Sequence, residues 1–471
     1  MWAHRLSRRD VLARGAAGLA AGILAGPLTG CTSGAAGQAP AQRGRLLLRG
    51  GCVLSLDPAA GDFETADVLI DGSTIAGIAP RIDADAEVID ASSMIVMPGF
   101  VDTHRHMWQG ALRNILPNGL LRDYGRDITG TARALFRPED ARIGNLVTAL
   151  GALNAGVTTV LDWSHIGNSP EHTDAAIEGL REAGLRAVYA FGPGSGPSVR
   201  FPDDIRRLRT QHFPSSDALL TLAMATGTSA ADWALARDVG AHISLHVNGS
   251  LSVPERIMGP DVTYIHCTSL SAEAWARIAA TGGHVSIACP IEMEMGHGVP
   301  PIREALEHGI RPSLSVDVET QMPGEFFTQM RSVFTLQRMQ ALQQERETGR
   351  AARLLTTREV IEFATIAGAR ANRLDARIGT LTPGKQADVI LLRTDLINVL
   401  PLNNVYGAIV QAMDTSNVDT VIVGGQVRKR AGQLVGVDLA AVRRQAEASR
   451  DHIVSRAGWP RTPFGGYLPG H

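Results

Sequence analysis

The sequence predicts an α/β protein: a closed (β/α)8 barrel of the TIM type, with a small β-sandwich formed by the two flanks of the barrel. Three observations predict this fold. Strand-like apolar runs alternate with helical patterns between residues 96 and 376, as in consecutive βα units. Eight such runs can be counted, which is the number that closes a barrel. Short strands broken by turn residues lie on both sides of this region. An open doubly wound sheet is the alternative.

The first thirty residues have the features of an export signal and are set aside from the fold. Residues 7–12 read Ser-Arg-Arg-Asp-Val-Leu, which resembles a twin-arginine signal, and a weakly apolar stretch follows. That stretch ends in Leu-Thr-Gly-Cys31, which resembles a bacterial lipobox with Cys31 as the lipidated residue. We therefore expect a signal peptide at 1–30, a flexible tether at 31–43 and an exported, extracytoplasmic lipoprotein anchored to a bacterial membrane. A plain signal peptide with a chance cysteine is the alternative.

The flanks of the barrel carry short-strand patterns. Val68-Leu-Ile precedes an Asp71-Gly72 turn, and Asp388-Val-Ile-Leu-Leu and Thr420-Val-Ile-Val follow the barrel. We expect the two flanks to pair into one composite sandwich. The predicted division is 44–95 and 377–436 for the sandwich, 96–376 for the barrel, and 437–471 for a C-terminal helix and tail.

The barrel strands are predicted from apolar runs of strand length. They are 94–100, 157–162, 186–191, 219–225, 242–247, 262–267, 284–289 and 311–317. Helices are predicted where start signals precede helical periodicity. They include 138–155, 171–184, 271–281, 324–346 and 356–373.

Composition excludes some classes of protein and site. A formal charge of −2 argues against a nucleic-acid binder, which usually carries a basic surface. Cys52, Cys267 and Cys289 form no C-x-x-C pair, so no cysteine zinc site or disulfide framework is indicated. The chain has only two lysines, Lys385 and Lys429, and both lie outside the barrel segment.

Histidines and one aspartate follow the predicted strands at their carboxyl ends. His104 and His106, after the first strand, are two residues apart and therefore share one face. The same alternation directs His246, His266 and Asp317, on the fifth, sixth and eighth strands, toward the barrel axis. Polar groups at these positions are difficult to explain as core packing. Because active sites of such barrels lie at this end, we expect a metal site here.

At this point the chain resembles the amidohydrolase superfamily, in the branch of cytosine deaminase and the atrazine-chlorohydrolase-like enzymes. The resemblance is carried by G-x-x-D-x-H-x-H at 99–106, by His246, by Ile-His-Cys at 265–267 and by Asp317. The run Gly-Thr-Leu-Thr-Pro-Gly-Lys-Gln-Ala-Asp at 379–388 resembles that superfamily's C-terminal sandwich. The match spans residues 44–436.

The resemblance implies roles for these residues. His104, His106, His246 and Asp317 are expected to ligate one divalent transition metal, zinc first and iron as the alternative. His266 is expected to lie outside the ligand set and to polarise the water or the substrate. Asp317 is expected to act also as the general base, since a divalent ion lowers the pKa of bound water towards about 7.

The resemblance also bears on the number of metal ions. Binuclear members of the superfamily bridge two ions with a carboxylated barrel lysine, and this barrel segment has none. One metal is therefore expected.

One position departs from the resemblance. Deaminases of this branch carry H-x-x-E after the fifth strand, and here that position is Gly249. Amidine deamination by the usual route is therefore in question. Glu292, Glu294 and Glu319 are the candidates to move the proton instead, with Glu292 preferred; a solvated loop carboxylate is the alternative for each.

Other residues near strand ends are candidates for the substrate pocket. Trp108, His165 and His297 are the preferred ones, with Trp163 as a further pocket wall. Core packing or an ordinary loop position is the alternative for each.

The sequence thus predicts a metal-dependent hydrolase that attacks a non-peptide C–N bond of a small, cyclic amide or amidine. One alternative is displacement of chloride or a substituted amine from a heteroaromatic ring, and another is a metal-loaded binding protein without turnover. The expected partners are a small-molecule substrate and the membrane, through the lipid, and no nucleic acid. A homo-oligomer remains open.

Overall fold

The computed structural model describes residues 44–461. The predicted signal peptide, Cys31 and the tether, together with residues 462–471 of the tail, lie outside the described residues.

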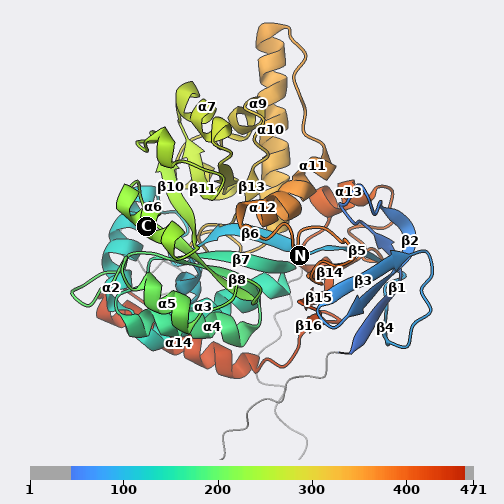
Figure 1. Cartoon of the computed structure of the whole chain (residues 1–471), viewed down its shortest axis with the longest axis horizontal. Coiled ribbons are helices and arrows are strands. Elements are labelled where there is room, and N and C mark those ends of the chain that lie inside the picture. Colours follow the sequence, from blue (N-terminus) through green and yellow to red (C-terminus); the bar gives the residue numbers. More distant parts are fainter. Residues whose placement is uncertain (1–43, 462–471) are drawn as a thin grey trace, which may run out of the picture. The chain divides into compact units, whose positions relative to one another are not determined.

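Eight parallel strands, joined in chain order, form the barrel (Figure 1). They are β6 Phe100–Arg105, β7 Val157–Ser164, β8 Arg186–Phe191, β9 Leu220–Ala225, β10 His242–Asn248, β11 Val262–Thr268, β12 His284–Ile287 and β13 Ser313–Leu314. Each is buried over most of its length, as parallel strands covered by helices should be. The predicted fold class is confirmed.

The first predicted strand, 94–100, is in fact parts of two strands. β5 (Met94–Pro98) pairs with the flanking sheet, and the barrel begins only with β6 at Phe100. The break falls at Gly99, whose N–H donates to the carbonyl of Asp388. A Cβ at Gly99 would lie 2.2 Å from the side chain of Thr158, so this crossing between sheets requires glycine.

Helices follow the strands and cover the barrel. The longer ones are α3 Pro138–Asn154, α4 Pro170–Ala183, α5 Ile205–Gln211, α6 Ala230–Asp238, α7 Ala272–Ala280, α9 Ile302–Glu307 and α10 Phe326–Thr348. The predicted helix at 356–373 is one run of three parts, α11 Thr357–Glu362, the π-helical η4 Phe363–Ala367 and α12 Gly368–Ala371. Serine caps open α6 and α7, where Ser229 and Ser271 accept from backbone N–H groups three residues on.

Short elements fill the connections. At the carboxyl ends of the strands these are η1 Met107–Leu112, α1 Leu121–Tyr124, the π-helical η2 Gly125–Ala132, α2 Arg133–Leu135, η3 Glu255–Ile257 and α8 Cys289–Glu294. Near the C-terminus they are α13 Val405–Gly407, η5 Ala408–Ala412 and η6 Thr415–Asn417, before the terminal helix α14 Leu439–Arg456, which packs against α3.

The two flanks form one nine-stranded, mostly antiparallel sheet. Its strands are β1 Arg45–Val53, β2 Phe63–Asp71, β3 Thr74–Ala79, β4 Glu87–Asp90, β5, β14 Val389–Arg393, β15 Val418–Val423, β16 Gln426–Arg430 and β17 Gln433–Leu434. The pairing of β5 with β14 joins the N-terminal to the C-terminal flank. One side of this sheet encloses an apolar core of its own, which includes Leu48, Val68, Val96, Leu391 and Ile422.

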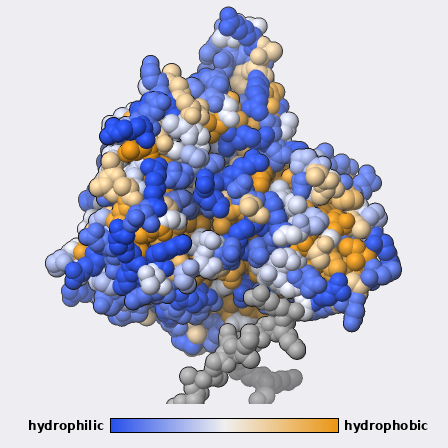
Figure 2. Space-filling model, viewed as in Figure 1, coloured by the Kyte–Doolittle hydropathy of each residue, from blue (hydrophilic) through white to orange (hydrophobic). Residues whose placement is uncertain are grey.

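The face seen in Figure 2 is largely hydrophilic, with separate apolar areas. Within residues 44–461, no helix combines the length and the apolar composition that crossing a membrane requires.

Candidate metal centre

Four side chains from three strand ends converge at the mouth of the barrel. His104 and His106 end β6, His246 lies on β10, and Asp317 follows β13. One donor atom from each lies within 4.8 Å of the other three. His104 Nε2 is 3.0 Å from Asp317 Oδ1 and 3.1 Å from His246 Nε2, and His106 Nε2 is 3.4 Å from Asp317 Oδ1. The structure thus brings together the four residues that the sequence predicts as metal ligands.

Asp317 is placed by the closure of the barrel rather than by a strand. The predicted strand 311–317 is too long, because β13 ends at Leu314. Beyond it, the N–H of Asp317 donates to the carbonyl of His104 (3.0 Å), and the N–H of His106 donates to that of Asp317 (2.8 Å). The first and last strands of the barrel are therefore joined through the backbones of three candidate ligands.

Two residues of the site adopt strained backbone conformations. Asp317 and His266 each have a φ of 68°, in the left-handed region that residues other than glycine rarely enter. Such strain persists only where the surrounding structure holds it, and it concentrates at functional sites.

Arg105 lies between the two histidines of β6 but points away from them. Its fully buried guanidinium donates to Asp102 (2.7 Å), to Glu319 (2.8 Å) and to the carbonyl of Gly324. Glu319 also accepts from Arg113, so both of its oxygens are bound to arginines. The prediction that Glu319 is a candidate for proton transfer is therefore wrong. Glu294, the third candidate, is exposed on α8.

Hydrogen bonding and burial prepare the imidazoles to bind a metal. His106 Nδ1 donates to the carbonyl of Trp163 (2.8 Å), which leaves the lone pair of Nε2 facing the cluster. Burial lowers the pKa of His106 to about 3, and it also lowers those of His104 and His246. Burial alone would raise the pKa of Asp317, but its interaction with the His104 ring, 3.0 Å away, outweighs burial and holds the pKa well below its usual range.

The donor set fits a divalent ion. Nitrogen and oxygen ligands about 2.0–2.2 Å from one zinc ion lie roughly 3–4 Å apart, as the contacts of His104 do here. Neutral imidazoles and an ionised carboxylate are the ligand forms that such an ion requires.

His266 and Glu292 form a buried pair beside this cluster. His266 Nδ1 lies 3.0 Å from Glu292 Oε1, and His266 Nε2 lies 3.7 Å from Asp317 Oδ2. Glu292 Oε1 also accepts from the N–H of Ala288, while Oε2 has no partner among the described residues. Burial would lower the pKa of His266, but the Glu292 hydrogen bond and the charges of Asp317 and Glu292 raise it. The structure therefore brings Glu292 to the site through His266.

The predicted pocket residues fall into two groups. His165 stacks on His106 with ring centroids 4.2 Å apart, and His297 packs edge-on against His266 at 4.5 Å. Neither nitrogen of His297 has a hydrogen-bond partner within residues 44–461. Trp108, in contrast, is fully buried, so the prediction that it lines the pocket is wrong; its Nε1 donates to His165 Nδ1 (2.9 Å). The ring of Trp163 packs against that of His246, with ring centroids 4.4 Å apart.

Sequence reasoning missed a group of residues in the segment between β6 and α3. Tyr124, which accepts from Gln109 (2.5 Å), is near enough to Asp317 for that charge to contribute, after burial, to raising the pKa of its hydroxyl. Arg133 follows the π-helical η2. No strand or helix period marks these positions, so the pattern carried no signal for them.

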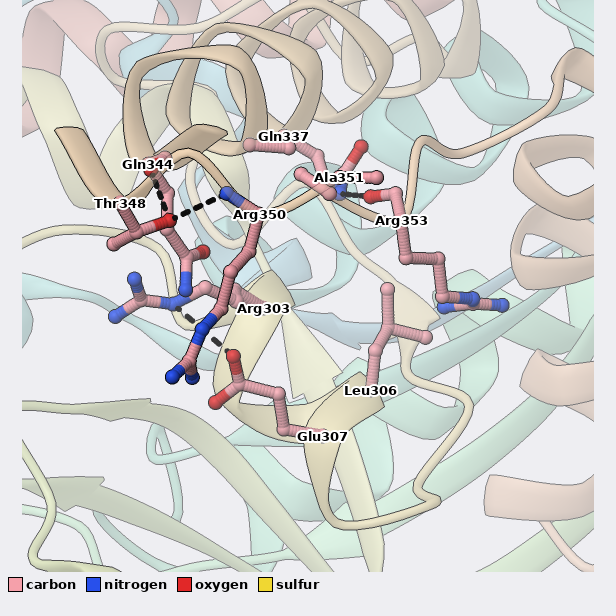
Figure 3. A pocket seen from close by; sticks show the side chains of 11 residues that line it. Arg303, Leu306, Glu307, Gln337, Gln344, Thr348, Arg350, Ala351 and Arg353 are labelled. Atoms are coloured by element: carbon pink, nitrogen blue, oxygen red, sulfur yellow. Dashed lines mark hydrogen bonds and ion pairs between the residues drawn. The ribbon is translucent and has the colours of Figure 1, made fainter. Parts of the chain in front are cut away.

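A separate hollow of about 310 Å³ lies between α9, α10 and the segment after α10 (Figure 3). Two of its three arginines pair with carboxylates: Arg303 pairs with Glu304 and Glu307, and Arg353 with Glu359. None of the predicted site residues lines it.

Comparisons with known proteins agree with this geometry. The chain is 24% identical over 446 residues to a 5'-deoxyadenosine deaminase of Methanosarcina mazei, covering 87% of this chain and 99% of the relative. It is 27% identical over 448 residues, with the same coverage, to a 5-methylthioadenosine/S-adenosylhomocysteine deaminase of Desulforudis audaxviator.

Solved structures show the same fold. The superposition on an adenosine deaminase of Xanthomonas campestris with bound zinc has a TM-score of 0.77 at 21% identity, covering 87% of this chain and 98% of the other. An atrazine chlorohydrolase of Arthrobacter aurescens complexed with zinc gives 0.76 at 22% identity, covering 86% of this chain and all of the other. Residues 95–428, which contain all four candidate ligands, match the sequence profile of the amidohydrolase family. The chain belongs to the amidohydrolase family.

Proposed function

We propose that the protein is a deaminase-type hydrolase that removes an amino group from a small, cyclic amidine. The observation that carries the proposal is the cluster of His104, His106, His246 and Asp317, with the His266–Glu292 pair next to its carboxylate. The curated relatives named above, which are deaminases of nucleosides and related compounds, support the choice of a C–N bond.

The residues divide the chemistry between them. A divalent ion held by the four ligands supplies Lewis acidity, which makes water acidic enough to lose a proton near neutral pH. Asp317, ionised and at the mouth of the barrel, accepts that proton. His266, protonated because its hydrogen bond to Glu292 raises its pKa against burial, donates from Nδ1 to Glu292 and from Nε2 toward the oxygen that attacks or the charge that develops on the substrate.

We propose that the site holds one ion, with zinc preferred to iron. A histidine-rich set with one carboxylate suits zinc, and two of the similar solved structures contain it. Neither lysine is placed to bridge a second ion: Lys385 donates to the carbonyl of Ile378 and Lys429 to that of Asn154.

Gly249 favours a second candidate, displacement of chloride or a substituted amine from a heteroaromatic ring. Its N–H donates to the carbonyl of Thr268, its φ is 75°, and no atom lies within 4 Å of where a Cβ would stand. No carboxylate therefore extends from this position to protonate a ring nitrogen. We propose that the His266–Glu292 pair takes over the proton transfer, with His266 as the donor and Glu292 acting through it.

A product assay separates the two candidates. Metal-loaded protein is expected to release ammonia from an aminated heterocycle in a panel that contains cytosine, 5'-deoxyadenosine and a chlorotriazine. Cytosine should be turned over about 10²–10⁴-fold more slowly than the best member, because the His266–Glu292 pair approaches from a different direction than a carboxylate at position 249 would and protonates its ring nitrogen poorly. Chloride release without ammonia would favour the second candidate, and rapid deamination of cytosine would contradict the argument from Gly249.

We also propose that the N-terminal segment exports the protein and anchors it through a lipid on Cys31. Changing Arg8 and Arg9 together to lysine should retain the precursor in the cytoplasm, because the twin-arginine machinery reads both side chains. Cys31→Ala should release the exported protein from membranes. Cell fractionation measures both, and membrane attachment that survives Cys31→Ala would overturn the lipid anchor.

A further inference from the structure

We propose that Arg133 binds an anionic oxygen group of the substrate, a carboxylate or a phosphate, so that the enzyme acts on an acidic heterocycle rather than a neutral one. This inference rests on the proposed function and adds a substrate class to it.

Arg133 is a half-buried cation without an ion-pair partner among the described residues 44–461. Its Nε is buried and makes no hydrogen bond, and no carboxylate between residues 44 and 461 pairs with its guanidinium. Burial lowers its pKa, as expected for a charge held away from water. A charge in such a place is costly unless it is paired, so a bound anion would satisfy it.

The position of Arg133 separates it from other arginines with an unbonded Nε. Arg49 and Arg428 lie on β1 and β16 of the flanking sheet, and Arg331 lies on α10, where it donates to the carbonyl of Met413. Arg133 lies at the carboxyl ends of the barrel strands, and its carbonyl accepts from Asn168, just after β7 (2.8 Å). Its guanidinium is also close enough to His165 for the charges of the two side chains to interact.

His165 and Tyr124, which interact with the charge of Arg133, can both donate a hydrogen bond. The indole N–H of Trp108 can only donate, so His165 Nδ1 must accept and the proton of the neutral ring is on Nε2. No described residue accepts that proton. Tyr124 accepts from Gln109 and leaves its own hydroxyl proton free to donate.

A guanidinium, an imidazole N–H and a phenol O–H together suit an oxyanion. Arg133 directly follows the π-helix η2, which ends at Ala132, and its guanidinium is close enough to Tyr124 and His165 for the charges to interact; π-helical turns often mark functional sites.

Matched substrate pairs test the inference. The turnover of metal-loaded protein is compared within two sets of substrates. The first set is cytosine and 5-carboxycytosine; the second is 5'-deoxyadenosine, adenosine 5'-carboxylate and adenosine 5'-monophosphate. The acidic member of at least one set should have a kcat/KM about 10- to 100-fold higher than its neutral partner, the usual gain from a charge-assisted hydrogen bond. Arg133→Gln should remove that preference, because kcat/KM for the acidic member should fall about 10-fold or more further than kcat/KM for the neutral member. The carboxylate and phosphate arms identify which oxyanion is preferred.

The control is Arg122→Gln, which removes an arginine whose side chain is 79% exposed on the neighbouring α1. It should leave the preference intact. If no compound is turned over, binding of the same compounds is measured by calorimetry. An acidic compound that binds the wild type, and binds Arg133→Gln about 10- to 100-fold more weakly, supports the inference even though the proposed reaction fails. A wild type with no preference for any acidic member, or an Arg133→Gln variant that loses both members of a pair equally, overturns it.

Discussion

Replacing Asp317 with asparagine is expected to reduce turnover by about 10²–10⁴-fold, even with saturating zinc, because the amide cannot accept the proton of the attacking water. The amide keeps the size of the carboxylate, and the backbone bonds of residue 317 to His104 and His106 do not involve the side chain. The barrel should therefore still close. Steady-state kinetics at saturating zinc, with metal analysis of the same samples, measures the effect.

The control is Asp83→Asn, which removes a carboxylate whose side chain is 83% exposed and should leave turnover unchanged.

The wild type should hold close to one metal ion per chain, and His104→Ala, which removes a ligand, should lose most of that metal. Two ions per chain, reproducibly, would show that the argument from the missing barrel lysine is wrong. Full activity in Asp317→Asn would remove this residue from the proposed chemistry.

The parts of the structure in which apolar residues recur with the period of a helix or a strand were predictable from the sequence. The alternation of apolar runs with helical patterns identified the barrel, because each unit has to bury a face of its own. The two-residue period along β10 and β11 placed His246 and His266 on the barrel mouth for the same reason. His104 and His106 were placed correctly, although the strand that carries them begins later than predicted.

The parts set by tertiary contacts were not predictable in this way. β13 is two residues long because the chain at Asp317 turns into a left-handed conformation and bonds to β6, which no local pattern encodes. Trp108 was predicted as a pocket wall, since nothing in the sequence indicates that its ring is buried and its N–H is committed to His165. Arg133 was missed because it follows a π-helix, whose spacing matches neither the helix nor the strand period.

The position of His266 predicts a variant that keeps the metal and loses the chemistry. Its Nε2 faces Asp317 and its Nδ1 faces Glu292, while the four ligands are complete without it. His266→Ala should therefore retain the metal and lose turnover by about 10²–10⁴-fold, the usual contribution of a positioned proton donor. Loss of the metal in this variant would place His266 among the ligands instead.

Glu292→Gln tests whether the charge behind His266 matters and not only its position. The amide oxygen of glutamine can still accept from the N–H of Ala288 and from His266 Nδ1, as Glu292 Oε1 does, so the geometry survives. The negative charge that helps to raise the pKa of His266 is lost. We expect kcat to fall by about 10²-fold or more, with KM and metal content unchanged. The control on the same helix is Glu294→Gln, whose side chain is exposed and which should behave as wild type. Equal losses in the two variants, or a Glu292→Gln enzyme with normal kcat, would show that the buried carboxylate only packs, because a charge acting through His266 has to appear in the rate of the chemical step.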